Sequence, residues 1–86
     1  MKRAAIISAI LDNPGESQRL FNDVVSNYSE MIRGRMGIPF GEKKIALISL
    51  MVVAELDMIN TFTGKLGRLN GVTVKVFIAR EDVVVE

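Results

Sequence analysis

The sequence predicts an α+β domain of ferredoxin-like architecture, a βαββαβ chain in which four antiparallel strands carry two helices on one face. Three observations predict this fold. Apolar strand-like runs alternate with helix-like apolar stripes in that order, turn residues separate them, and 86 residues are enough for one hydrophobic core. We therefore expect a single domain over residues 1–86, with residues 80–86 as a tail or a short edge strand.

The first strand and the first helix are predicted by residues 4–28. Residues 4–11 are almost wholly apolar and are followed by turn residues, the pattern of a strand buried on both faces. The next residues resemble a helix start, in which Asn13 caps, Pro14 takes the first helical position and Glu16 completes a capping box. The helix then carries one apolar stripe, made of Leu20, Phe21, Val24, Val25 and Tyr28.

The middle of the chain predicts two strands and a turn. Residues 31–36 are the second strand, and residues 41–44 are the turn. Between them, residues 37–39 are expected to leave regular structure, because proline lacks a backbone N–H and restricts the residue before it. Residues 45–54 form the longest apolar run and predict a third strand with few polar side chains on either face.

The second helix is predicted over residues 56–69. Its buried side is expected to consist of Ile59, Phe62, Leu66 and Leu69. Gly64 and Gly67 lie inside it, where each glycine costs about 1 kcal/mol relative to alanine. They therefore suggest a close backbone approach or a contact. Asn70 or Gly71 is expected to supply a left-handed cap at the end of this helix.

Residues 72–79 alternate with period two and predict the fourth strand, and residues 83–85 are a candidate short fifth strand. Right-handed crossovers give the strand order 4-1-3-2. The two central strands are then the two most apolar ones, with apolar residues on both faces. We expect a second sheet to cover the exposed face, which makes the protein a homo-oligomer, a dimer or a tetramer.

Composition excludes several classes of function. Eleven basic and ten acidic residues give a net charge of +1, which provides no electrostatic footprint for nucleic acid. The first and third strands also lack the aromatic residues on which RNA-binding domains of this topology stack bases. No run is long enough to span a membrane, and residues 4–11 are a poor signal peptide. Without cysteine or a targeting signal, the cytoplasm is the expected location.

The sequence also lacks the side chains of common active sites. It contains no histidine and no cysteine, so neither an imidazole base nor a thiolate nucleophile is available. Acylphosphatases share this topology and use an arginine in the loop after the first strand, but residues 12–16 contain none. We therefore expect a protein that is not an enzyme, has no cofactor and forms no tight transition-metal site by itself.

Two segments resemble a known family. Residues 32–39 read IRGRMGIP and residues 63–75 read TGKLGRLNGVTVK. At this spacing they resemble the iron-only hydrogenase system regulators, small proteins whose ferredoxin-like fold is akin to ACT domains and to the ligand-binding domain of nickel-responsive repressors. The resemblance covers roughly residues 4–78 and implies a regulatory or sensory domain in transcriptional or metabolic control. Where this family has tyrosine after Ile-Pro, the chain has Phe40 and lacks the hydroxyl.

The resemblance also supplies the candidate ligand or partner-binding residues. They are Gly34, Arg35, Met36, Gly37, Ile38, Pro39, Gly64, Lys65, Gly67 and Arg68. Positive side chains beside glycines allow an anionic ligand to approach the backbone. In the alternative interpretation the cations are solvated, and the glycines serve turns or tight packing. The partner is thus a small-molecule effector or a regulatory protein, and the alternative function is a structural or adaptor module that binds a protein without a small ligand.

Overall fold

The computed structural model describes residues 1–80 of the chain. Its elements are β1 Arg3–Asp12, α1 Pro14–Ser26, η1 Ser29–Met31, β2 Ile32–Phe40, β3 Ile45–Ala54, α2 Leu56–Gly67 and β4 Val72–Ile78. This is the predicted βαββαβ order. The structure adds the short η1 turn, which the sequence pattern does not predict. The strand expected over residues 83–85 lies outside the described residues.

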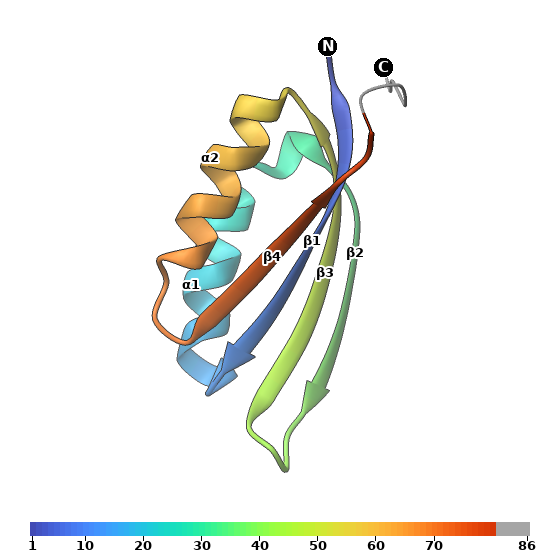
Figure 1. The fold of residues 1–86 in the computed structure, drawn as a ribbon. Helices are drawn as coiled ribbons and strands as arrows, with labels where there is room; N and C mark the ends of the chain where they lie inside the picture. Colours follow the sequence, from blue (N-terminus) through green and yellow to red (C-terminus); the bar gives the residue numbers. More distant parts are fainter. Residues whose placement is uncertain (81–86) are drawn as a thin grey trace.

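The four strands form one antiparallel sheet, and both helices lie on the same face of it (Figure 1). The strand order is β2-β3-β1-β4, so the predicted order and the ferredoxin-like α+β fold are confirmed. β1 and β3 are the central strands, and β2 and β4 are the edges of the described sheet. No element of residues 1–80 covers the opposite face, which is called the open face below.

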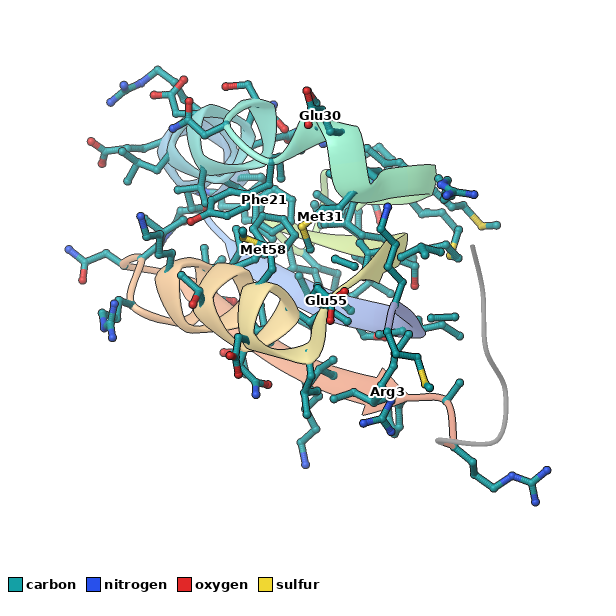
Figure 2. All side chains as sticks on the ribbon, turned by 90° about the horizontal axis from the view of Figure 1, so that it is seen from above. Arg3, Phe21, Glu30, Met31, Glu55 and Met58 are labelled. Carbon is teal, nitrogen blue, oxygen red and sulfur yellow. The ribbon has the colours of Figure 1, made fainter. Side chains whose placement is uncertain are left out.

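The hydrophobic core lies between the sheet and the helices, where alternate strand residues meet the apolar stripes of α1 and α2. Figure 2 shows Phe21 of α1 between the helical layer and the sheet. The largest fully buried side chains come from both layers: Phe21, Phe62, Ile7, Leu11, Leu50, Ile59, Leu66 and Val52. The predicted buried side of the second helix is therefore correct, with Leu69 packed against the core from just beyond the helix end.

β2 is longer than predicted, and the expectation that residues 37–39 leave regular structure is wrong. The strand continues to Phe40, and Pro39 lies opposite Ala46 of β3. An edge strand needs hydrogen bonds on one side only, so it can include a proline whose missing N–H faces away from the sheet. The irregularity lies earlier, where a register shift between Ile32 and Gly34 marks a β-bulge.

The helix ends also differ from the prediction. Pro14 opens α1 as expected, but Asn13 has a left-handed backbone with φ of 49° and makes no side-chain capping hydrogen bond. Ser17 instead ties the first turn to β1, because its hydroxyl donates to the Asp12 carbonyl oxygen at 2.8 Å. α2 ends at Gly67, and the left-handed residue is Gly71, which lies in the turn before β4.

Candidate functional site

The pairing register fixes which side chains share the open face. Residues directly opposite each other in an antiparallel sheet point to the same side of it. Three rows of paired residues therefore cross all four strands, and each is named here by its β2 residue. The Gly34 row is Gly34, Met51, Ile6 and Phe77; the Met36 row is Met36, Ser49, Ser8 and Lys75; the Ile38 row is Ile38, Leu47, Ile10 and Thr73.

These rows expose large apolar side chains. The exposed fraction ranges from 38 % for Leu47 to 63 % for Met36 among Ile6, Ile10, Met36, Ile38, Leu47 and Phe77. A hollow of about 530 Å³ lies over the Met36 and Ile38 rows, with Ser8, Ser49, Thr73 and Lys75 as its polar lining. A sheet face that stays in water is normally polar, so this face has the composition of a contact surface.

β2 divides the first predicted segment between the two faces of the sheet. Met36 and Ile38 point to the open face, whereas Arg35 pairs with the buried Leu50 and points to the helix side. There the Arg35 guanidinium donates to Asn22 Oδ1 at 2.7 Å. Its carbon Cζ also lies 5.8 Å from the centroid of the Phe21 ring, a cation–π contact. Arg35 is therefore exposed but held in one orientation.

The second predicted segment lies on α2. Lys65 Nζ is 5.7 Å from the centroid of the Tyr28 ring, and that ring lies 4.8 Å from the ring of Phe62. A Cβ added to Gly67 would lie 3.4 Å from Val74 Cγ2, so this glycine permits close packing of α2 on β4. Within the part of the chain that the structure describes, a Cβ on Gly64 would meet only the Arg68 guanidinium, at 4.0 Å. Packing thus explains Gly67 but not Gly64.

The predicted site residues fall on separate surfaces. Arg35, Gly37 and Pro39 line a hollow of about 430 Å³ with Gln18. Lys65 lines a different hollow with Tyr28 and Thr61. The structure places Arg35 on β2 against α1, and it places Lys65 in the last turn of α2 with Arg68 just after that helix. This placement does not test whether the three cations act on one ligand, so a shared anion site stays a prediction.

The sequence predicts an apolar surface on the two central strands. The structure shows that the edge strands β2 and β4 also contribute exposed apolar side chains to it. Phe77 is 62 % exposed and lies at the end of the Gly34 row, yet it is not among the predicted ligand or partner-binding residues. The period-two pattern of residues 72–79 contained the signal, because it puts Phe77 on the face opposite to Val76. The exposed apolar surface therefore extends over all four strands.

Within residues 1–80, no three carboxylate, histidine or cysteine side chains lie close enough together to hold a metal ion. No helix in the same residues has both the length and the apolar character needed to cross a membrane.

Comparison with protein families decides the relationship. Residues 3–76 match the TM1266-like family, whose members are described as iron-only hydrogenase system regulators. The chain belongs to this family. The resemblance seen in the two sequence segments is thereby confirmed, and the family description supports a regulatory domain. A comparison with curated proteins found no match.

Solved structures agree with this family and its fold. The uncharacterized protein TM1266 from Thermotoga maritima is 32 % identical, with a TM-score of 0.89 over 93 % of this chain and 100 % of that chain. The ACT domain from the GTP pyrophosphokinase of Chlorobium tepidum is 22 % identical, with a TM-score of 0.77 over 90 % and 100 % of the two chains. The second likeness shows an ACT-like fold for this family member.

A more distant neighbour is an enzyme. SnoaB, a cofactor-independent oxygenase from Streptomyces nogalater, is 12 % identical, with a TM-score of 0.56 over 94 % of this chain and 96 % of that chain. At this identity the likeness concerns the fold alone, and one fold hosts many functions. The family description favours a role without catalysis.

Proposed function

We propose that this family member is a cytoplasmic regulatory domain that works as a homo-oligomer, a dimer or a tetramer, joined through the open face of its sheet. In this role it senses a small-molecule effector and contributes to transcriptional or metabolic control of a hydrogenase system. A net charge of +1 provides no electrostatic footprint for nucleic acid, so in this proposal control of transcription involves a separate DNA-binding chain. The family description supports the regulatory role.

One observation carries the proposed assembly: most of the large exposed apolar side chains of the described residues gather on the open face. Ile6, Ile10, Ile38 and Phe77 are each at least 45 % exposed in the single chain, and all four lie on the rows defined above. Scattered exposed apolar residues are ordinary, but a contiguous apolar patch on a sheet marks an interaction surface. A second copy is the partner that is always present at the same concentration.

The assembly is tested by light scattering of the purified protein at micromolar concentration. We expect a molecular mass of two or four times 9.5 kDa. A single-chain mass under these conditions would contradict the proposal.

The sensory role is tested by a thermal-shift screen of metabolites. An effector that binds only the folded protein stabilises it by about 2.7 kcal/mol at 100 times its dissociation constant. We expect at least one small anionic metabolite to raise the melting temperature in a concentration-dependent way. An oligomer that no metabolite stabilises would instead favour the alternative function, an adaptor module that binds a protein partner.

The candidate site residues give a prediction that separates binding from stability. Arg68→Ala is expected to change the free energy of unfolding by no more than about 0.5 kcal/mol, as is usual for an exposed side chain. Arg35→Ala is expected to lower it by about 0.5–1 kcal/mol, because the exposed cation–π contact with Phe21 is lost. Urea unfolding followed by circular dichroism measures both, and each variant should weaken binding of the effector found in the screen.

Arg19→Ala is the matched control, because Arg19 is an exposed arginine on α1 outside the two predicted segments. It should leave binding unchanged. A loss of more than about 2 kcal/mol for Arg35→Ala or Arg68→Ala, without a specific effect on binding, would show that the arginine is structural, since such values exceed those of ordinary surface substitutions.

A further inference from the structure

The three rows of the open face also contain information on how two copies face each other. Most soluble homodimers have two-fold symmetry, and sheets packed face to face commonly keep their strands within about 30° of each other. Two aligned arrangements satisfy both conditions. The two-fold axis runs either parallel to the strands, between β1 and β3, or perpendicular to them within the plane between the sheets.

The parallel axis places each row over the same row of the second copy in reversed order. β2 then faces β4, and β3 faces β1, as follows from the strand order. In the Gly34 row, Phe77 of each copy lies over Gly34 of the other. Phe77 is 62 % exposed, while Gly34 has no side chain, so the largest protruding group meets the lowest point of the row.

The open face is hollowed beside Gly34, although Gly34 itself is not among the residues that line the hollow. A hollow of about 370 Å³ extends across this end of the open face, with Ala4, Ile6, Met51 and Val53 in its lining and Arg33 and Phe77 among its remaining residues. Among residues 1–80, the side chain close to a Cβ built on Gly34 is that of Met51, whose Cε lies 3.1 Å from it. Methionine adapts easily to a neighbouring ring, and its sulfur makes favourable contacts with aromatic groups.

The other two rows match equally well under the parallel axis. Lys75 of one copy lies over Met36 of the other, where its aliphatic stem covers the thioether and its ammonium reaches water at the sheet edge. Ser8 faces Ser49, and across the spacing of about 10 Å between facing sheets their hydroxyl groups can hydrogen-bond through a bridging water. In the third row Ile10 faces Leu47, which buries apolar surface on both sides.

The perpendicular axis gives poor matches between side chains, because it places each strand over the same strand of the second copy. If it crosses the Met36 row, Lys75 faces Lys75, and like charges brought opposite each other in a contact are destabilising. If it crosses the Gly34 row, Phe77 faces Phe77 while Gly34 faces Gly34, so one edge is crowded and the other is empty. If it crosses the Ile38 row, Phe77 moves beyond the end of the opposing strand.

We infer that two copies of this chain pack open face to open face about a two-fold axis parallel to the strands, with Phe77 of each copy inserted over Gly34 of the other. This inference rests on the proposed assembly through the open face and specifies its geometry. Phe77 is the anchor of the contact, since large aromatic side chains that enter a partner's hollow dominate interface energies.

Cross-linking through introduced cysteines tests this geometry cleanly, because the sequence contains no cysteine. Met36→Cys and Lys75→Cys are made separately, and one of them carries a tag that changes its size. Facing sheets lie about 10 Å apart, which is too far for a direct disulfide, so a short bis-maleimide is used. The two proteins are mixed, equilibrated and cross-linked, and circular dichroism verifies that each is folded.

We expect the mixed Met36–Lys75 product to exceed each of the two self-linked products by about 10-fold or more. Predominant Lys75–Lys75 product would overturn the inferred axis while leaving assembly through the open face intact. Oligomers by light scattering without any cross-link would overturn both the inferred axis and the use of this face. A monomer would contradict the proposed function itself.

A second measurement does not depend on cross-linking. Phe77→Ala is expected to raise the dissociation constant of the dimer by at least about 10-fold in sedimentation experiments, with the single-chain fold unchanged because Phe77 is exposed. Thr73→Ala, on the same strand and the same face, is the control. It should change the dissociation constant of the dimer by less than about 3-fold. Equal effects of the two substitutions would overturn the role of Phe77 as the anchor.

Discussion

Ile48→Glu will unfold the domain, whereas Leu47→Glu will leave it folded and abolish its assembly. These neighbours occupy the same central strand, β3, but successive strand residues point to opposite faces. Ile48 is 4 % exposed beneath the helices, and Leu47 is 38 % exposed on the open face. The same glutamate is therefore placed in the core in one variant and in the proposed interface in the other.

The expected magnitudes differ widely. A domain of 86 residues has a free energy of unfolding of about 4–13 kcal/mol at the usual value per residue. Burying an unpaired carboxylate in place of Ile48 costs more than about 4 kcal/mol, which equals or exceeds the whole stability at the lower end of that range. Leu47→Glu should change the stability of the single chain by less than about 1 kcal/mol, because the added carboxylate stays hydrated.

Circular dichroism and light scattering together distinguish the two outcomes. Ile48→Glu should lose its far-ultraviolet signal, and Leu47→Glu should retain it at a mass of 9.5 kDa. Leu47→Ser is a useful companion, because it removes apolar surface without adding charge and should weaken assembly less. A Leu47→Glu protein that keeps the mass of the wild-type oligomer would show that the open face is not the subunit contact.

The strand order could be predicted from the sequence because several local signals agree. The two most apolar runs fall at the positions that the βαββαβ topology makes central. β1 and β3 do occupy those positions. The same runs also have apolar residues on both faces, and the exposure of Ile6, Ile10 and Leu47 confirms this reading of the open face.

The errors have a common physical cause, since each concerns a residue whose conformation is set by distant contacts. Because of Pro39, residues 37–39 are predicted to leave regular structure, but whether proline is tolerated depends on the strand being at the edge, which is a property of the whole sheet. Asn13 has the composition of a helix cap, yet its backbone N–H donates to the Lys44 carbonyl oxygen at 3.0 Å. That contact with the β2–β3 turn cannot be seen in local sequence.

The candidate site could be predicted only in part for a similar reason. Residues 32–39 are contiguous in sequence, but a strand sends them alternately to two faces. Arg35 is thereby directed to Asn22 on α1, while Met36 is directed to the open face. A motif read as one string therefore contributes to two surfaces, and only the pairing register assigns each residue to one of them.

Gly71→Ala is expected to destabilise the domain, whereas Gly15→Ala is expected to stabilise it. Gly71 has φ of 78°, a left-handed conformation that costs other residues roughly 1–2 kcal/mol. A Cβ at this position would also lie 3.0 Å from the Asp12 carbonyl oxygen. That oxygen has little freedom to move, because it already accepts the hydroxyl hydrogen bond of Ser17 at 2.8 Å.

The effect extends to the junction of three elements. The Asp12 N–H donates to the Gly71 carbonyl oxygen at 2.7 Å, which connects the end of β1 to the start of β4. Moving the Gly71 backbone to relieve the new Cβ contact would lengthen this hydrogen bond, so the strain cannot be removed without a second loss. We expect a decrease of about 1–3 kcal/mol in the free energy of unfolding.

Gly15 provides the matched control, because Gly15→Ala also adds one Cβ but is expected to raise the free energy of unfolding. It lies in the first turn of α1, and no atom of the described residues 1–80 lies within 4 Å of its added Cβ. Alanine there restricts the unfolded chain and improves helix propensity, which should raise the free energy of unfolding by up to about 1 kcal/mol. Urea unfolding of the two variants at equal protein concentration measures the difference. Similar values for both would mean that the left-handed turn at Gly71 is not required by the fold.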